Sequence, residues 1–364
     1  MSFASSHDLR FMAAAIRHAR MNLGRTGTNP SVGTLLVRGD VIIGRGVTAP
    51  GGRPHAETQA IAEAGELAQG ATAFVTLEPC AHHGRTPPCA NALVNAGVTR
   101  VVIGASDPDP RVSGKGARIL RDAGIEVIEG VLADEAIEGL SGYLTRSLKK
   151  RPEVTLKLAV SADGMIGRKG AGQVAVTDDI SRRMVHLMRA QSDAIMVGAG
   201  TVLADDPDLT CRLPGLAKRS PIRIVLDGRL SAPASSKLAM SARNVPVWIA
   251  GLASADATNR AALEAAGCRI LSCEDHEEKV ALPELLDDLG AEGISSLMLE
   301  GGAQTARHFL DEGLVDRIVL FTSNALVGEG GIAAPLKPAH MPAGFELARQ
   351  EAYGSDLRRD YVKV

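Results

Sequence analysis

Aromatic side chains are scarce in this chain of 364 residues, which has six Phe, three Tyr and one Trp. Proteins that bind single-stranded nucleic acid stack bases on aromatic rings, and a formal net charge of −2 adds no attraction for a polyanion. The composition therefore argues against nucleic acid as a partner. Apolar residues still make up 45% of the chain, so aliphatic side chains must fill the cores.

Long apolar runs are also missing. No window approaches the ~18 consecutive apolar residues of a membrane helix, and Arg10, Arg17 and Arg20 in the N-terminal segment do not fit a secretory signal. The five cysteines are an odd number in a long chain, which argues against a disulfide framework. These absences predict a cytoplasmic protein without a membrane partner, whose thiols are free or bind metal.

Hydrophobic periodicity predicts two α/β domains. The length exceeds the ~150 residues of an average domain, and strand-like and helix-like runs alternate in both parts of the chain. The expected elements include a helix over 8–23, a hairpin over 32–47, a helix over 55–68 and strands at 100–105, 222–226, 296–299 and 315–321. A basic cluster at 149–152 ends in proline and directly precedes a strand-like run. We therefore predict domains of residues 1–149 and 150–364.

Four residues of the first part have the chemistry of a zinc hydrolase. His55 and Glu57 open one predicted helix, and Cys80 and Cys89 precede and open the next. Catalytic zinc takes three protein ligands and a water, whose pKa falls to about 7 on the metal. His55, Cys80 and Cys89 can supply the ligands for one zinc ion, and Glu57 can carry the water's proton to a leaving amine. This pattern is typical of zinc nucleobase deaminases.

The segment between the two cysteines is longer than the usual Cys-x-x-Cys spacing, and we expect it to loop out over the pocket. His82 and His83 in this segment are candidates for substrate contact or spare ligands, although exposed loop histidines are common. Buried core thiols and a solvated helix-cap histidine are the alternative interpretation of the motif. Cys211, Cys268 and Cys273 have no partner motif and are interpreted as structural.

Several motifs carry a resemblance to a known family. With TNPSVG at 28–33, HAE at 55–57 and TLEPCAHHGRTPPC at 76–89, the chain resembles the bifunctional deaminase/reductases of riboflavin biosynthesis. KLAVSADG at 157–164 and the segment 189–212 extend the resemblance over essentially the whole chain. It implies a cytidine-deaminase-like α/β/α domain followed by a dihydrofolate-reductase-like α/β domain.

The resemblance also implies the chemistry. The first domain would use zinc to deaminate 2,5-diamino-6-(5-phosphoribosylamino)pyrimidin-4-one, a small pyrimidine ribotide, with Asn29 contacting its base or ribose. The second would reduce the ribosyl group to ribityl with NADPH, in a homo-oligomer (dimer or tetramer). NADPH would lie against Ala159, Thr201, Asp205, Gly301 and Gly302. The ribotide pocket would be lined by Arg189, Leu209, Arg212 and Glu300.

The residue types themselves support parts of this assignment. The Gly301-Gly302 pair follows an apolar strand and precedes a helix, so its amides can approach a phosphate at the helix N-terminus; a tight turn is the alternative. Arg189 and Arg212 suit a substrate phosphate because guanidinium binds its oxygens bidentately. Arg189 also stands late in a predicted helix, where a cation can simply complement the helix dipole.

We expect the carboxylates of Asp205 and Glu300 to transfer protons during hydride transfer. The sequence does not determine which of the two matters more. Many relatives carry Ser-x-Trp-Ile-Thr where this chain has QVAVT at 173–177. The absent tryptophan, at Ala175, removes a large wall of the reductase pocket. Two alternatives stay open: a nucleic-acid deaminase with a non-catalytic C-terminal module, and a second domain that serves only as an inactive scaffold.

Overall fold

The chain is described here by a computed structural model that covers residues 4–81, 87–109 and 113–364. It divides into two compact units, Met1–Lys150 and Arg151–Val364. None of the helices within the described residues combines the length and the apolar character that a membrane crossing requires.

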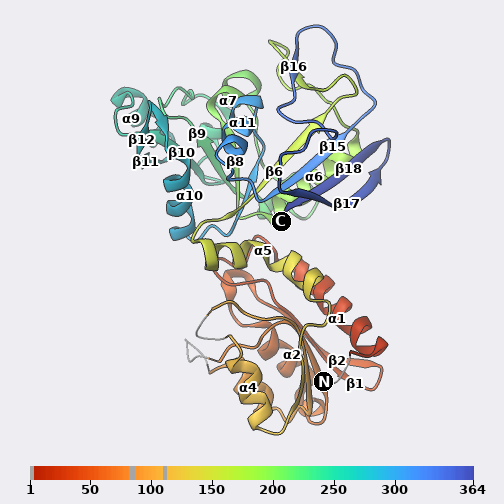
Figure 1. The fold of residues 1–364 in the computed structure, drawn as a ribbon. Coiled ribbons are helices and arrows are strands. Elements are labelled where there is room, and N and C mark those ends of the chain that lie inside the picture. The colour runs from red at the N-terminus through yellow and green to blue at the C-terminus, as the bar shows by residue number, and fades with distance from the viewer. Residues whose placement is uncertain (1–3, 82–86, 110–112) are drawn as a thin grey trace. The chain divides into compact units, whose positions relative to one another are not determined.

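The first unit is built on one five-stranded sheet, in the order β2-β1-β3-β4-β5 (Figure 1). The strands are β1 (Gly33–Arg38), β2 (Val41–Val47), β3 (Thr72–Leu77), β4 (Arg100–Ala105) and β5 (Glu126–Ile128). The helices are α1 (Ser6–Ala19), α2 (Ala56–Ala64), α3 (Cys89–Asn95), α4 (Lys115–Asp122) and α5 (Ala133–Lys149). The predicted hairpin forms, since β1 pairs antiparallel with both β2 and β3, whereas β3, β4 and β5 run parallel.

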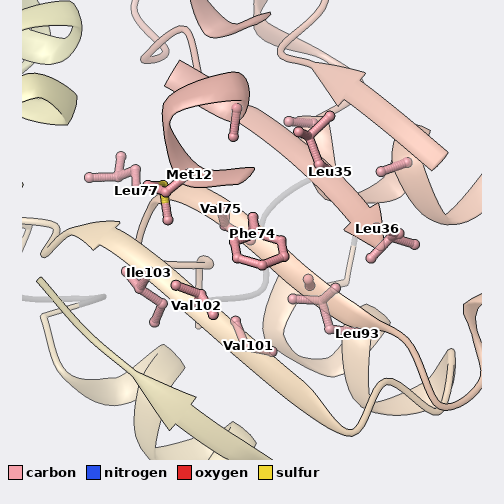
Figure 2. Packing of buried hydrophobic residues seen from close by; sticks show 14 of the residues in the cluster. Met12, Leu35, Leu36, Phe74, Val75, Leu77, Leu93, Val101, Val102 and Ile103 are labelled. Carbon is pink, nitrogen blue, oxygen red and sulfur yellow. The ribbon is translucent and has the colours of Figure 1, made fainter. Parts of the chain in front are cut away.

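The core of this unit is mainly aliphatic, as the composition requires. Strands β1, β3 and β4 contribute side chains to its centre, and Met12 of α1 and Leu93 of α3 pack with them (Figure 2). Phe74 is one of its few aromatic rings and is fully buried. Helix α1 begins at a capping box in which the side chains of Ser5 and Asp8 each accept a hydrogen bond from the other's backbone N–H.

Two glycines of β2 let helix α2 lie unusually close to the sheet. A Cβ on Gly46 would be 2.0 Å from the carbonyl oxygen of Ala56, and one on Gly44 would be 2.2 Å from that of Ala60. Any side chain at either position would push α2 away from β2. The close approach fixes the first turn of α2, which contains Glu57 and follows His55.

The second unit is built on a nine-stranded sheet, in the order β11-β10-β9-β8-β14-β6-β15-β18-β17. Its strands are β6 (Glu153–Val160), β8 (Ala194–Gly198), β9 (Ile222–Leu226), β10 (Val247–Leu252), β11 (Arg269–Cys273), β14 (Ser296–Leu299), β15 (Arg317–Thr322), β17 (Phe345–Tyr353) and β18 (Asp356–Lys363). Short strands pair separately as β7 (Met165–Arg168) with β16 (Gly331–Ala333) and β12 (Asp275–His276) with β13 (Lys279–Val280). The helices are α6 (Asp179–Gln191), α7 (Ala199–Asp205), α8 (Lys237–Met240), α9 (Ala257–Ala266), α10 (Leu282–Ala291) and α11 (Ala303–Asp311).

The long hairpin β17–β18 at the end of the chain has no counterpart among the predicted strands. Most of β17 is exposed, and its sequence FELARQEAY lacks the alternation of apolar and polar residues that marks a half-buried strand. Strand β18 pairs antiparallel with β15. The hairpin turn also holds the start of α6: the Asp178 carboxylate accepts from the backbone N–H of Ser355, and the Asp356 carboxylate accepts from the N–H of Asp178.

The neighbouring strands β8, β14 and β6 run parallel, so their carboxyl ends meet at one edge of the sheet. Helices α10 and α11 pack on one face of the sheet and α6 on the other. Ligands of open α/β sheets bind beyond the carboxyl ends of the strands, at the point where the strand order reverses. The motif residues that follow these strands are therefore brought together.

Candidate functional site

Three of the predicted metal ligands come together in the first unit. His55, Cys80 and Cys89 each offer one ligand atom, and these atoms all lie within 4.8 Å of one another. His55 Nδ1 is 3.3 Å from the Sγ of Cys89 and 3.8 Å from the Sγ of Cys80. One imidazole and two thiolates form a donor set that suits zinc and leaves a fourth position for water. The residues therefore fit the predicted metal.

The loop that carries Cys80 is anchored by Glu78, a residue that the sequence analysis did not single out. Its buried carboxylate accepts hydrogen bonds from the backbone N–H groups of Gly114, Gly116 and Ala117, at 2.9–3.2 Å. These groups belong to the start of α4, where an anion is favoured by the helix dipole. Glu78 thus ties the segment before Cys80 to a rigid element.

Glu57 lies beside the ligand cluster with one oxygen unsatisfied. The residue is 3% exposed, and its Oε2 has no hydrogen-bond partner among the described residues. Burial raises the pKa of the Glu57 carboxyl. A hydrogen bond with the Cys89 side chain, together with His55, lowers the pKa of Cys80 to about 4, so a thiolate is available for a metal. A buried carboxyl with one unpartnered oxygen next to this thiolate is suited to proton transfer.

Asn29, the predicted substrate contact of this site, lies half-buried before β1. Its side chain packs against Gly52, where a Cβ would come within 2.1 Å of the Asn29 amide nitrogen. That amide has no hydrogen-bond partner among the residues that the structure describes. It can therefore bind a ligand. The predicted loop with His82 and His83 lies outside the described residues.

In the second unit the structure gives Arg189 a partner other than the phosphate that we expected. Its Nε and Nη2 donate to the two carboxylate oxygens of Glu300, at 2.7 and 3.0 Å, and its Nη1 donates to the carbonyl oxygen of Thr210 at 3.1 Å. The guanidinium fork is thereby occupied within the protein, and Arg189 is 8% exposed. Two residues predicted to line the ribotide pocket thus bind each other, because a buried charge is costly without an opposite charge beside it.

Lys157 stands next to this pair and was not assigned a role from the sequence. It lies on β6, two residues before Ala159 and on the same face. Burial alone would raise the pKa of Glu300, but Arg189 and Lys157 lower it to about 2. Burial lowers the pKa of Lys157, and Glu300 opposes that effect. Glu300 is therefore ionised at neutral pH, and a carboxylate cannot donate a proton. A cation inside a central strand was the available signal.

The glycines after β14 fit a phosphate-bearing cofactor. Helix α11 starts directly after Gly301 and Gly302 and has no side-chain cap, so its first N–H groups are open to an anion. A Cβ on Gly302 would be 3.4 Å from Thr201 Oγ1, and one on Gly198 would be 2.3 Å from Thr305 Oγ1. The starts of α7 and α11 are therefore in contact. Thr201, Gly301 and Gly302, which are predicted to contact the cofactor, lie close together there.

The remaining predicted residues of the reductase site lie at the end of α7, in the segment after it, and in the segment before α6. Asp205 ends α7, and burial raises the pKa of its carboxyl. Leu209 is buried with a φ of +56°, and the Arg212 side chain is 54% exposed, 3.5 Å from the Asp208 carboxylate. Arg212 is thus the more accessible of the two predicted phosphate ligands. Ala175 is exposed in the segment between β7 and α6.

Comparisons with known proteins cover both units. The family described as RibD C-terminal domain matches residues 152–358, and the cytidine and deoxycytidylate deaminase zinc-binding region matches residues 5–105. The riboflavin biosynthesis protein RibD of Actinobacillus pleuropneumoniae is 38% identical over 100% of this chain and 97% of its own. The Escherichia coli protein of the same name is 38% identical over 88% of this chain and 89% of its own.

Solved structures agree. Acinetobacter baumannii RibD, form 2, has a TM-score of 0.83 at 36% identity, covering 98% of this chain and 99% of that one. A diaminohydroxyphosphoribosylaminopyrimidine deaminase/5-amino-6-(5-phosphoribosylamino)uracil reductase of Thermotoga maritima has a TM-score of 0.85 at 35% identity, with the same coverage.

Proposed function

The chain belongs to the RibD family of riboflavin-biosynthesis enzymes, and from this premise we propose which residues carry each of its two reactions. The protein joins a zinc-dependent deaminase to an NADPH-dependent reductase. The predicted fold, a cytidine-deaminase-like domain followed by a dihydrofolate-reductase-like domain, is confirmed. The alternatives of a nucleic-acid deaminase and of an inactive scaffold are set aside.

We propose that residues 1–149 deaminate diaminohydroxyphosphoribosylaminopyrimidine and that residues 150–364 reduce 5-amino-6-(5-phosphoribosylamino)uracil. These are the compounds in the name of the Thermotoga maritima relative. The near-complete coverage of both chains supports the transfer of both activities. We also propose a cytoplasmic homo-oligomer, a dimer or tetramer, on the strength of the family membership and the free thiols of the sequence.

In the deaminase site, His55, Cys80 and Cys89 would hold the zinc ion. When bound, zinc supplies a water that ionises near neutral pH. Glu57 takes a proton from the attacking water and delivers it to the leaving amino nitrogen, because its free oxygen is buried beside the ligands. Asn29 donates its unpartnered amide to the base or ribose and so orients the ring.

In the reductase site, Gly301, Gly302 and Thr201 would hold the phosphates of NADPH at the start of α11, and Ala159 and Asp205 would be further cofactor contacts. NADPH supplies the hydride. Arg212 and Leu209 contact the ribotide from the loop after α7.

The proton needed when the sugar ring opens comes from Lys157, whose amine lies beside Glu300. Glu300 serves as the fixed anion that orients Arg189 and Lys157, rather than as the proton donor that its residue type suggested. This revises the role that we expected for it. Asp205, half-buried with a raised pKa, keeps the alternative role of a second proton carrier.

The observation that carries the deaminase assignment is the buried Oε2 of Glu57, which lacks a partner among the described residues, beside the His55, Cys80 and Cys89 cluster. We expect Glu57→Gln to retain zinc while deamination falls by about 10²–10⁴-fold, the usual contribution of a general acid/base. Reduction of the deaminated ribotide, followed by NADPH absorbance, should not change. Glu66→Gln, on an exposed residue just past α2, is the control. Loss of zinc together with activity would assign Glu57 to the metal instead.

A further inference from the structure

Arg223 is among the largest fully buried side chains of the protein and has 0% exposure. It lies on β9, and no carboxylate within the described residues forms an ion pair with it. Its Nη1 donates to the carbonyl oxygen of Asp208 at 3.2 Å and to Ser241 Oγ at 2.8 Å, and its Nη2 donates to the carbonyl oxygens of Ser241 and Val245. Its Nε has no partner among those residues.

Such an arrangement is costly for stability. A buried cation loses its hydration, and carbonyl and hydroxyl oxygens offset this loss less well than a carboxylate does. Burial accordingly lowers the pKa of Arg223. An apolar side chain of similar volume would fill the same space, so a stabilising role does not explain the residue.

The segment that Arg223 holds has a constrained backbone. Asp206 and Leu209 both have positive φ, +39° and +56°, which side-chain-bearing residues rarely adopt. The Asp206 carboxylate accepts from the N–H of Lys237, which anchors one end of the segment. The Asp208 carbonyl lies between the two residues and is bound by Arg223. The turn is therefore held from β9 and from the start of α8.

We propose that Arg223 is a positioning residue of the reductase, which sets Leu209 and Arg212 in the ribotide pocket through its hydrogen bond to the Asp208 carbonyl. The proposal rests on the proposed function of this loop. Arg223 itself does not touch the substrate or the cofactor. It acts by keeping the strained turn in the one conformation that presents both side chains.

The test compares Arg223→Met with Ile224→Ala, which removes buried apolar volume from the next residue of β9, in the core on the opposite face. Ile224→Ala should lower Tm because it leaves a cavity, whereas Arg223→Met, which replaces a costly buried cation by an apolar side chain of similar volume, should not. We expect Arg223→Met alone to raise the KM for the deaminated ribotide by about tenfold to a hundredfold, the usual effect of a small misplacement, with a smaller change in kcat. Amide exchange in residues 206–212 should rise, and deaminase activity should stay unchanged.

Equal KM values in the two variants would overturn the proposal. Should Arg223→Met not fold, Ser241→Ala removes one partner of the guanidinium and is expected to raise the KM in the same direction, and an unchanged KM there counts against the proposal. Arg212→Ala distinguishes a failure of the proposed ribotide-binding role of the loop from a failure of the positioning role of Arg223. If it leaves the reductase unchanged, the proposed function of the loop fails; if it weakens ribotide binding while Arg223→Met does not, only the positioning role fails.

Discussion

The two sites are assembled in opposite ways. The ligands of the deaminase site come from residues 55–89, with His55 and Cys89 at the starts of two helices and Cys80 in the loop after β3. The charged cluster of the reductase site joins Arg189 to Glu300, which are 111 residues apart. A metal demands donor atoms of a fixed kind, so its site can be recognised from residue types and order. The pairing within a cluster of charged residues cannot be identified from the sequence, because each charged side chain has several possible partners along the chain.

Removal of a metal ligand should have the largest effect and should separate the sites completely. We expect Cys89→Ala to lose zinc and all measurable deamination, since two ligands do not complete a catalytic zinc site, while the reductase retains its rate. Metal analysis and the two separate assays check this, with Cys268→Ala as a control for loss of a buried thiol. Loss of both activities would show that the units depend on each other.

A smaller but still large effect is expected from breaking the charged pair. Arg189→Met leaves the buried Glu300 with Lys157 as its remaining cation, and such a break typically costs about 3–5 kcal/mol of unfolding free energy. Urea unfolding measures the loss, and the reductase assay should fall with it. Arg189→Met combined with Glu300→Leu and Lys157→Met should recover stability without activity, because no charge of the cluster is then left unpaired. A single variant as stable as the wild type would mean that the pair carries no net energy.

The smallest expected effect is a displacement in pH. Burial holds the pKa of Lys157 below its ordinary 10.5, so reductase activity should fall as the pH rises through that lowered value and the amine loses its proton. Lys157→Arg should lower reductase activity across the profile and remove this alkaline limb, because arginine stays protonated and cannot give up its proton. The pH profile of kcat/KM measures both effects, and the deaminase profile is the internal reference. An unmoved limb would assign the proton to another group.

Glu300 determines how the stability of the reductase unit depends on acid pH. Its carboxyl has a pKa of about 2 in the folded protein against an ordinary 4.5. Its stabilising contribution is therefore complete above the ordinary value and is lost as the pH falls toward 2. The acid limb of the reductase profile should accordingly not report Glu300.

Most of the fold was predictable because strands such as β4, β8 and β14 are short, buried and largely apolar runs. The hairpin β17–β18 was not, because its exposed strand carries no apolar period. In the deaminase site, the predicted metal ligands meet as expected, whereas Glu78 acts through backbone groups of α4 that no motif reveals. In the reductase site, Lys157 and Arg223 were missed because a lone cation in a strand does not show what it binds.

The final strand also bears on how the protein is made. Domains generally fold as units, beginning at the N-terminus while the ribosome is still extending the chain. The first unit is complete once Lys150 has emerged, whereas the second needs β18, which ends at Lys363, to cover β15 and to secure Asp178 at the head of α6. A nascent chain can therefore acquire its zinc site long before its reductase exists. Premature termination within the last strand would leave a deaminase with an unfinished neighbour.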